Sequence, residues 1–315
     1  MIKRAIIYFI VFTLFLYALR ILNYHGLLKQ KTGYYGKYKA AFLEKHDYDV
    51  LFLGSSRVEM HFEPKLFDSI TGANSFNLSL IGINSPVAFA ALKAYLVNNK
   101  APLHLFYETD FHFLRYNTHD IKEFNNFFPF FKNEVLLNEF NEIDPRMKHF
   151  YYNPYYSWPY TGFKNLSTSL HGWFNIPNKY DSLMYKGYIK DNFHDTLKLK
   201  ISKPYTAYFE IGNRNYLDSI IVLCKNRGIA ISLISSPMFA GGKIDLLNKN
   251  QIVNQLNYIA KINNIEHLDM SSLPFCNRRN LFADHFHLNY KGALLFTRKF
   301  ATYYRNILQK NTLKH

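Results

Sequence analysis

Short apolar runs recur along the chain and alternate with longer segments that have helical periodicity. Five of these runs, rich in β-branched or aromatic residues, are predicted to be strands: VLFL at 50–53, SFNLSL at 75–80, LHLFY at 103–107, IAISLI at 229–234 and IEHLDM at 265–270. Strands that alternate with helices favour a parallel sheet with helices on both faces. The sequence therefore predicts an α/β fold, a three-layer α/β/α sandwich around a five-stranded parallel sheet.

The segments between the runs carry helix signals. Residues 85–99 begin with Ser85 as the expected N-cap and Pro86 at the first helical position. Residues 215–228 have one apolar face that includes Cys224, for which a core position is expected. Two further segments show a similar pattern, residues 245–264 and 289–308.

Residues 111–200 interrupt this alternation with an aromatic, Asn-rich segment. Because structureless loops of that length are rare, we expect an inserted cap or subdomain with helices of its own. Its aromatic side chains either line a substrate cleft or form a small core of the insertion itself, and the core is the commoner role. The predicted organisation is an anchor at 1–24, a linker and first helix at 25–47, the sandwich domain with its insertion at 48–308, and a tail at 309–315.

The first 22 residues, MIKRAIIYFIVFTLFLYALRIL, are typical of a membrane anchor. Residues 5–19 carry no charge and would span roughly 22 Å as a helix, or roughly 27 Å to Leu22 if Arg20 snorkels, against a hydrocarbon core of ~30 Å. No small-x-small cleavage pattern follows, so an uncleaved signal anchor is favoured over a removed signal peptide. A buried amphipathic helix is the alternative.

Basic residues lie on both sides of this segment, so their count does not settle its orientation. Long domains translocate largely regardless of charge. We therefore expect a single-pass protein of the inner membrane with its N-terminus in the cytoplasm and its main domain outside.

The composition limits the partners. The formal net charge is +15, but no block of five or six consecutive basic residues occurs, which favours anionic lipid or acidic polymer and argues against nucleic acid. The two cysteines, Cys224 and Cys276, are too few for a disulfide framework and lack metal-ligand spacing. We expect no metal and no cofactor.

The stretch DVLFLGSSRVEM, residues 49–60, places two hydroxyls directly after a predicted strand. Serines at this position ordinarily cap the following helix. Ligands of parallel α/β sheets, however, bind beyond the carboxyl ends of the strands. One of the two serines is therefore a candidate nucleophile, provided that the chain also supplies a base, a carboxylate and oxyanion donors.

The stretch LFADHFHLNYKGA, residues 281–293, contains a base and a carboxylate. Asp284 can reach one ring nitrogen of His287 and leave the other free to accept a proton. Alone, such a pair is more often a surface hydrogen bond or half a metal site, and His285 is a competing base in a poorer position. Gly82, just past the second strand, is either a turn glycine or a backbone donor to a substrate oxygen.

Taken together, these segments resemble the GDSL, or SGNH, family of serine esterases and acyltransferases. LGSSR is similar to the first family block and puts Ser56 at the nucleophile position, which leaves Ser55 to serve the turn. NLSLIG is similar to the second block, with Gly82 at the oxyanion glycine, and DHFHLNYKG is similar to the last block, with Asp284 and His287. G-S-S-R-V lacks the second glycine of the α/β-hydrolase motif G-x-S-x-G.

One block departs from the family pattern. Where the family has G-x-N-D after the third strand, this chain reads YETDF, which contains no asparagine and leaves Asp110 as the side-chain candidate for the oxyanion hole. The resemblance covers residues 48–110 and 205–308, and it implies a flavodoxin-like sandwich of the SGNH hydrolase type.

The resemblance also implies a function. Ser56 would form an acyl intermediate, His287 would be the base, Asp284 would orient it, and the N–H groups of Ser56 and Gly82 would form the oxyanion hole. Membrane-anchored relatives that acylate cell-envelope polymers, such as the D-alanyl-transfer protein of teichoic acid modification and the alginate O-acetylation proteins, have a similar G-S-S block behind an N-terminal span. The expected activity is cleavage or transfer of an ester-linked acyl group.

The expected partners follow from the same resemblance. They are an acyl ester, an envelope polysaccharide or a lipid-linked acyl donor, and a membrane-bound O-acyltransferase. The alternatives are a plain anchored esterase, a non-catalytic module that binds a glycan or a partner protein, and a basic protein of the membrane surface.

Overall fold

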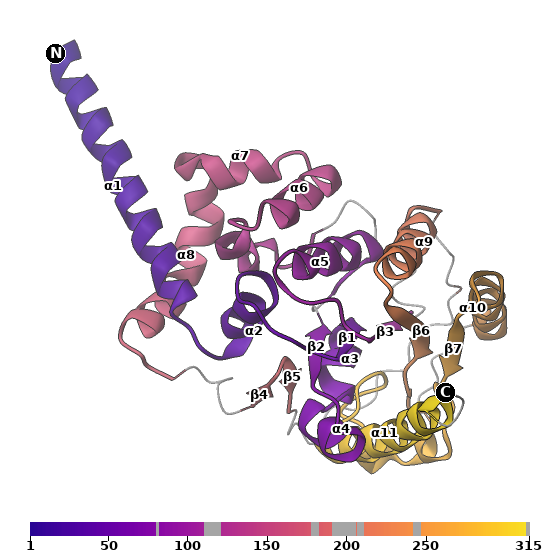
Figure 1. The fold of residues 1–315 in the computed structure, drawn as a ribbon. Helices are drawn as coiled ribbons and strands as arrows, with labels where there is room; N and C mark the ends of the chain where they lie inside the picture. Colours follow the sequence, from indigo (N-terminus) through magenta and orange to yellow (C-terminus); the bar gives the residue numbers. More distant parts are fainter. Residues whose placement is uncertain are drawn as a thin grey trace.

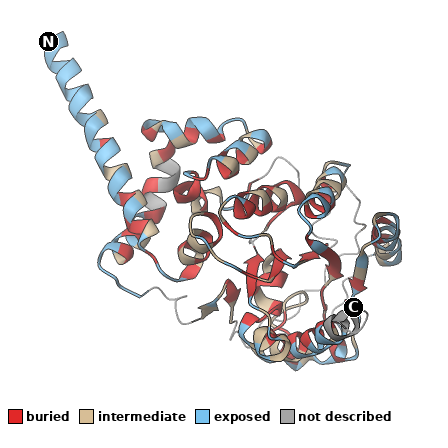
Figure 2. Cartoon of the chain, in the orientation of Figure 1, coloured by how far each residue is buried: buried red, intermediate tan, exposed pale blue. Residues whose placement is uncertain are grey.

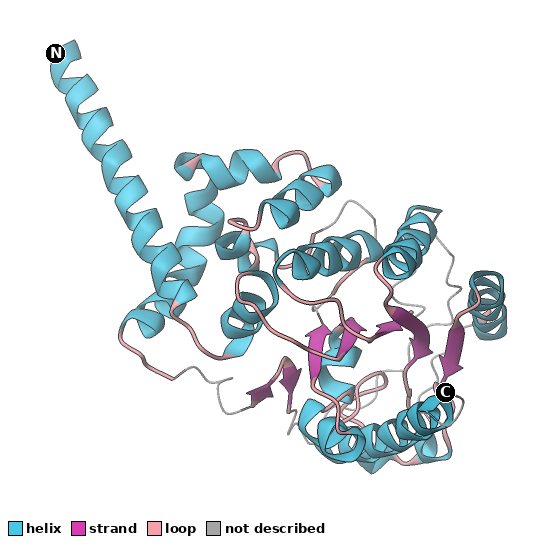
Figure 3. Cartoon of the chain, in the orientation of Figure 1, coloured by secondary structure: helices cyan, strands magenta, loops and turns pink. Residues whose placement is uncertain are grey.

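A five-stranded parallel sheet forms the centre of the molecule (Figure 1, Figure 3). The computed structural model describes residues 1–79, 82–109, 121–177, 183–190, 206, 211–241 and 247–312. The strands of the sheet are β1 (Val50–Gly54), β2 (Ser75–Ser79), β3 (His104–Glu108), β6 (Ala230–Ser235) and β7 (Glu266–Asp269). They pair in the order β2-β1-β3-β6-β7, and every pair is parallel. The predicted strand count and direction are confirmed, and each strand begins and ends within one residue of its predicted bounds.

Helices connect the strands. Those of the sandwich are α3 (Ser56–His61), α4 (Pro64–Thr71), α5 (Ser85–Asn98), α9 (Ile211–Asn226), α10 (Lys249–Asn263) and α11 (Tyr290–Thr312). Short 3₁₀ segments are η2 (Phe124–Asn126), η3 (Phe128–Phe130), η4 (Pro274–Asn277) and η5 (Arg279–Leu281). The four predicted helices correspond to α5, α9 and α10, which lie between strands, and to α11, which follows the last strand.

The sheet separates two apolar clusters, because successive side chains of a strand point to opposite faces. Leu51 and Leu53 of β1 pack in the cluster that contains side chains of α5, α9 and α10. Val50 and Phe52 pack in the cluster that contains α3, α4 and α11. Figure 2 shows the strands and the inner faces of these helices as buried, so the predicted three-layer sandwich is confirmed.

The N-terminus is a single long helix, α1 (Ile2–Leu28), which is long and apolar enough to cross a membrane. Its first half projects from the molecule with its apolar side chains exposed (Figure 1, Figure 2). Its second half packs along α8 (Pro154–Trp173), where the Trp173 indole donates a hydrogen bond of 2.8 Å to the Leu22 carbonyl. Helix α2 (Gly33–Phe42) then leads into the sandwich.

Three helices lie between β3 and β6 in the sequence. They are α6 (Glu134–Ile143), α7 (Met147–Tyr152) and α8. Buried aromatic side chains of this segment, among them Phe127, Phe130 and Phe140, pack in the same cluster as α2 and α5. These aromatic rings therefore extend the main core instead of forming a separate one.

A small antiparallel hairpin, β4 (Met184–Tyr185) and β5 (Tyr188–Ile189), lies at the edge of the sheet. The Lys186 carbonyl accepts a hydrogen bond of 2.9 Å from the N–H of Asn77 on β2. The hairpin thus uses a backbone donor that an open edge strand would expose.

Two local expectations can be compared with the structure. The N-cap of α5 is Asn84, whose side chain accepts the N–H of Val87 at 3.1 Å, so the prediction of Ser85 was wrong by one residue. An Asn side chain satisfies this free N–H as well as a serine does. Cys224 is buried in α9 as expected, and both Cys224 and Cys276 are free thiols.

Candidate active site

Ser56 begins α3 immediately beyond the carboxyl end of β1. The turn is tight at Gly54, since a Cβ on this residue would lie 2.5 Å from Cγ2 of Val58 and 2.8 Å from Cβ of Glu108. A glycine there lets α3 pack closely against the ends of β1 and β3. As a result, Ser56 is half-buried at the edge of the sheet where ligands of such folds bind.

Ser56, His287 and Asp284 form one hydrogen-bonded chain. The Ser56 Oγ lies 2.9 Å from Nε2 of His287, although the two residues are 231 positions apart in sequence. On the other side of the ring, Nδ1 of His287 lies 2.8 Å from Oδ2 of Asp284. The structure therefore brings together the three side chains named as nucleophile, base and orienting carboxylate.

The environment of Asp284 favours its charged form. Burial alone would raise the pKa of this carboxyl group, but the His287 ring and the backbone N–H groups of Phe286 and His287 donate hydrogen bonds to it and lower the pKa to about 2. Since both oxygens accept hydrogen bonds, the carboxylate is held in one orientation. It can therefore fix the tautomer of His287 and stabilise an imidazolium.

Ser55 has a different set of contacts from Ser56. Its Oγ donates a hydrogen bond of 3.0 Å to Oε2 of Glu108 and accepts the N–H of Arg57 at 3.3 Å as the N-cap of α3. Glu108 ends β3, is buried, and also lies 3.6 Å from Nε of Arg57. Ser55 therefore serves the turn, as the sequence suggested.

Arg57 fixes the start of α3 across the sheet. Its Nη2 donates hydrogen bonds of 2.5 Å to the Ser236 carbonyl and 3.2 Å to the Pro237 carbonyl, both just past β6. Together with Glu108, it ties the nucleophile turn to the ends of β3 and β6. Neither role was predicted from the sequence, because each depends on neighbours that are distant in the chain.

The histidine loop is held on both sides. Asn289 caps α11 by accepting the N–H of Gly292 at 3.1 Å, and a Cβ on Gly292 would lie 2.0 Å from the Leu281 carbonyl oxygen. His61 at the end of α3 accepts the N–H of Leu288 through Nε2 at 3.0 Å. Burial, helped by the nearby charges of Arg57 and His287, lowers the pKa of His61 well below its usual range and keeps it a neutral acceptor.

His285, the competing base, is placed differently. Neither of its ring nitrogens has a hydrogen-bond partner among the residues that the structure describes, whereas its carbonyl accepts the N–H of Phe239 at 3.0 Å. The Asp284 carboxylate pairs with the ring of His287 instead. The geometry thus favours His287.

Gly82 lies on the same edge of the sheet as Ser56. It follows β2 by three residues, and the end of β2 is in register with the end of β1, Ser79 opposite Gly54. Its φ is +64°, and the side chain of Lys122 lies over it. Within the described part of the chain, neither the N–H of Ser56 nor that of Gly82 donates to an acceptor. Both can therefore serve as oxyanion donors; Asp110, the third candidate, lies outside the described residues.

A buried ion pair behind α3 was not predicted from the sequence. Lys37 of α2 lies 2.9 Å from Oε1 of Glu59 on α3, and it also donates to Oγ of Ser79 at 2.8 Å and to the Gly187 carbonyl at 3.0 Å. Burial lowers the pKa of Lys37 and raises that of Glu59, and their mutual attraction opposes both shifts. The pair links α2, α3 and the end of β2. No local pattern distinguishes Lys37 from the exposed lysines around it.

Comparisons with known proteins add structural neighbours only. No family model matches the chain, and no curated protein matches it. Among solved structures, the chain is similar to the crystal structure of a proposed acylhydrolase from Bacteroides fragilis, with 14% sequence identity, coverage of 87% of this chain and 95% of that chain, and a TM-score of 0.41. The assignment of a function rests on the geometry of the site.

Proposed function

We propose that the chain is a membrane-anchored serine enzyme of the SGNH type that cleaves or transfers an ester-linked acyl group through an acyl-Ser56 intermediate. The observation that carries this proposal is the hydrogen-bonded chain from Ser56 through His287 to Asp284. Nucleophile, base and orienting group in this order are what activation of a serine hydroxyl requires.

The chemistry proceeds in two halves. Ser56 Oγ attacks the ester carbonyl carbon while His287 Nε2 takes its proton, and the N–H groups of Ser56 and Gly82 stabilise the oxyanion of the tetrahedral intermediate. Collapse of that intermediate breaks the bond to the alcohol, which leaves with the proton from His287. In the second half, His287 deprotonates water or an acceptor hydroxyl, which attacks the acyl-Ser56 carbonyl. Collapse of this second tetrahedral intermediate breaks the bond to Ser56 Oγ, which takes the proton back from His287, and releases the free acid or the new ester.

The anchor supports transfer over simple hydrolysis. A free-standing esterase gains nothing from being tied to a bilayer, whereas an enzyme that takes acyl groups from a membrane donor must stay at that surface. We propose that the domain lies outside the cytoplasm, that the acceptor is an envelope polysaccharide, and that a membrane-bound O-acyltransferase is a partner. The diffuse charge of +15 suits a place beside anionic lipid or acidic polymer.

Labelling with a serine-directed phosphonate tests the nucleophile. The full-length protein in detergent should be labelled at Ser56 and nowhere else, the Ser55→Ala variant should be labelled similarly, and the Ser56→Ala variant should not be labelled. Complete absence of labelling in folded wild-type protein would replace the enzyme by a non-catalytic binding module on the same scaffold.

The breakdown rate of the acyl-enzyme separates transfer from hydrolysis. We expect slow hydrolysis of simple soluble esters and faster turnover when a polyol or glycan acceptor is added. If acceptors of several sugar classes leave the rate unchanged and hydrolysis is already fast, the protein is a plain anchored esterase.

A further inference from the structure

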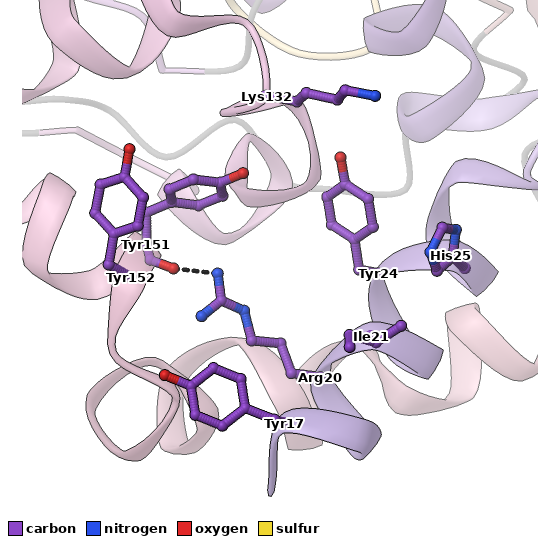
Figure 4. A pocket seen from close by; sticks show the side chains of 8 residues that line it. All are labelled: Tyr17, Arg20, Ile21, Tyr24, His25, Lys132, Tyr151 and Tyr152. Carbon is purple, nitrogen blue, oxygen red and sulfur yellow. Dashed lines mark hydrogen bonds between the residues drawn. The ribbon is translucent and has the colours of Figure 1, made fainter. Parts of the chain in front are cut away.

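A pocket of about 590 Å³ lies between the anchor helix and the helices that pack against it (Figure 4). It is lined by Tyr17, Arg20, Ile21, Tyr24 and His25 of α1, by Tyr151 and Tyr152 of α7, and by Lys132 between η3 and α6. None of these eight residues is acidic. The pocket therefore offers cations and phenol hydroxyls without a competing carboxylate in its wall.

Arg20 is the central group of the pocket. Figure 4 shows its guanidinium in the middle, with Tyr17 on one side and Tyr24 and Lys132 on the other. Nη2 donates a hydrogen bond to the Tyr151 carbonyl, and the guanidinium lies 5.3 Å from the ring centres of both Phe128 and Tyr151. These contacts hold the guanidinium in place. No ion pair of Arg20 occurs within the described ranges, so its charge is available to an anion.

The pocket lies at the domain end of the apolar half of α1. Closer to the N-terminus, the ring of Phe9 stacks on Tyr155 of α8 at 5.9 Å, and the hydroxyls of Thr13 and Tyr155 form a hydrogen bond. With a rise of about 1.5 Å per residue, Arg20 lies roughly 16 Å further along the helix than Phe9. Arg20 is the first charged residue after the uncharged run of residues 5–19, so if α1 crosses a bilayer, Arg20 lies at the domain end of the spanning segment.

The surface around the pocket has the composition of a membrane–water interface. Tyr152 and Tyr156, at the corner between α7 and α8, are 63% and 41% exposed, although their rings are large. Tyrosine is enriched where the hydrocarbon meets the headgroups, because its ring is apolar and its hydroxyl is polar. Ile21, which is 54% exposed, provides an apolar wall on the α1 side.

We propose that this pocket binds the phosphate of an anionic phospholipid headgroup, with Arg20 and Lys132 as its cations and the tyrosine hydroxyls as donors to the phosphate oxygens. The proposal rests on the proposed membrane anchor. The volume of the pocket exceeds that of a phosphate alone. The apolar wall of the pocket continues onto the exposed face of α1, where the glycerol and the first methylenes of a lipid can lie. The bound lipid would fix the orientation of the domain relative to the membrane plane.

Native mass spectrometry of the full-length protein in detergent tests this binding with phosphatidylglycerol and, separately, with phosphatidylcholine. We expect retained phosphatidylglycerol and little phosphatidylcholine. Lys132→Gln should weaken phosphatidylglycerol binding about fivefold and Arg20→Gln about tenfold or more, in line with the loss of a cation and of a hydrogen-bonded cation, respectively. Lys261→Gln, a matched change on the exposed face of α10, should leave binding unchanged.

Each possible result decides the proposal. Equal retention of the two lipids, or loss of binding in Lys261→Gln to the same extent as in Lys132→Gln, would overturn it. Displacement of phosphatidylglycerol by glycerol 3-phosphate or inorganic phosphate at equal concentration would assign the pocket to a soluble phosphate instead. If Arg20→Gln lowers the thermal unfolding midpoint, its loss of lipid binding is not interpreted. The test then rests on Lys132→Gln, because Lys132 is exposed and its replacement should not disturb the fold. Flotation with vesicles measures the anchor separately, so its failure is distinguishable from that of the pocket.

Discussion

Two adjacent serines at the end of β1 have different surroundings. Ser55 is engaged on both sides, by the N–H of Arg57 and by Glu108, and so its hydroxyl is used by the turn. Ser56 faces the ring of His287. Because a nucleophile needs a base within hydrogen-bond reach and a cap does not, this difference in partners separates the two roles.

The two serines should respond differently to substitution. We expect Ser56→Ala and His287→Ala each to lower esterase or transferase activity by roughly a thousandfold or more, because loss of one member of a Ser–His–Asp triad removes most of the effect of all three. Ser55→Ala should leave activity per folded molecule within roughly tenfold but lower the free energy of unfolding by about 1–3 kcal/mol, through the lost cap and the lost bond to Glu108. Steady-state kinetics and urea unfolding measure the two effects. If Ser55→Ala is the more damaging change to activity, the nucleophile is misassigned.

Asp284 should contribute to stability in acid as well as to orientation. Its pKa is about 2 in the folded protein against a usual 3.8, so its stabilising contribution is complete above pH 4 and is lost as the pH falls towards 2. We expect unfolding curves of wild type and Asp284→Asn to converge over this range, while Asp284→Asn at neutral pH remains folded and loses most activity. A constant difference in stability from pH 5 to pH 2 would contradict this account.

At the scale of elements, α2 supports the candidate site through Lys37. Because the Lys37 and Glu59 side chains are almost fully buried, removing one partner leaves the other charge without compensation. This pair therefore makes the position of α3, which carries Ser56, depend on α2, the helix that follows α1.

We expect Lys37→Met to lower the free energy of unfolding by about 3–5 kcal/mol, and the double variant Lys37→Met/Glu59→Leu to be more stable than either single variant. Lys39→Met, on the same helix, is the matched control, since Lys39 and its partner Glu44 are 33% and 41% exposed and such pairs contribute only about 0–1 kcal/mol. Urea unfolding of the full-length protein in detergent gives these values. Additive losses in the double variant would exclude the coupling.

We expect His104 to make the sheet itself sensitive to acid. It begins β3, contacts Oγ of Ser232 on β6 at 3.0 Å and stacks on Phe106. Burial lowers the pKa of His104 from 6.5 to about 4. The folded state therefore binds a proton at His104 more weakly than the unfolded state does. As a result, the free energy of unfolding is unaffected by His104 above pH 6.5 and decreases as the pH falls from 6.5 to about 4.

The expected loss over this interval is about 3 kcal/mol. In His104→Gln this part of the pH dependence should disappear, whereas His46→Gln, a change at a more exposed histidine, should retain it. Measuring the free energy of unfolding from pH 7 to pH 4 for the three proteins makes the comparison. An unchanged pH profile in His104→Gln would show that the acid sensitivity arises elsewhere.

At the scale of the whole molecule, α1 and the sandwich are joined through packed helices instead of a free linker. α8 lies along the second half of α1, and Gln30, just after α1, donates a hydrogen bond of 2.7 Å to the Thr168 carbonyl. The sandwich is therefore held close to the bilayer if α1 spans it, which suits an enzyme that works on membrane or envelope substrates.

The proposed orientation puts residues 30–315 outside the cytoplasm, with Met1 inside. A phosphatase that is active only outside the cytoplasm, fused to the C-terminus, should be active, and a reporter that is active only inside should be silent. The same pair of fusions on a protein of known orientation calibrates the assay. Activity of the cytoplasmic reporter would reverse the topology.

The sequence by itself determined the sheet and most of the candidate site. The strands and the helices α5, α9, α10 and α11 follow from hydrophobic periodicity, which is a local property of the chain. The alternation of the two predicts a parallel sheet, and in such a sheet Ser56 and Gly82, each following a strand, must lie at one edge. Asp284 and His287 are three residues apart, so their pairing also needed no long-range information.

The tertiary structure alone decided which distant groups meet. Ser56 reaches His287 only because α3 and the loop before α11 are packed side by side, and Glu108 supports the turn only because β3 lies next to β1. The Lys37–Glu59 pair and the packing of Phe127 and its neighbours into the main core were not predicted for the same reason. Such contacts depend on the simultaneous placement of segments far apart in the chain, and a periodic pattern read within one segment contains no information about the segment that will face it.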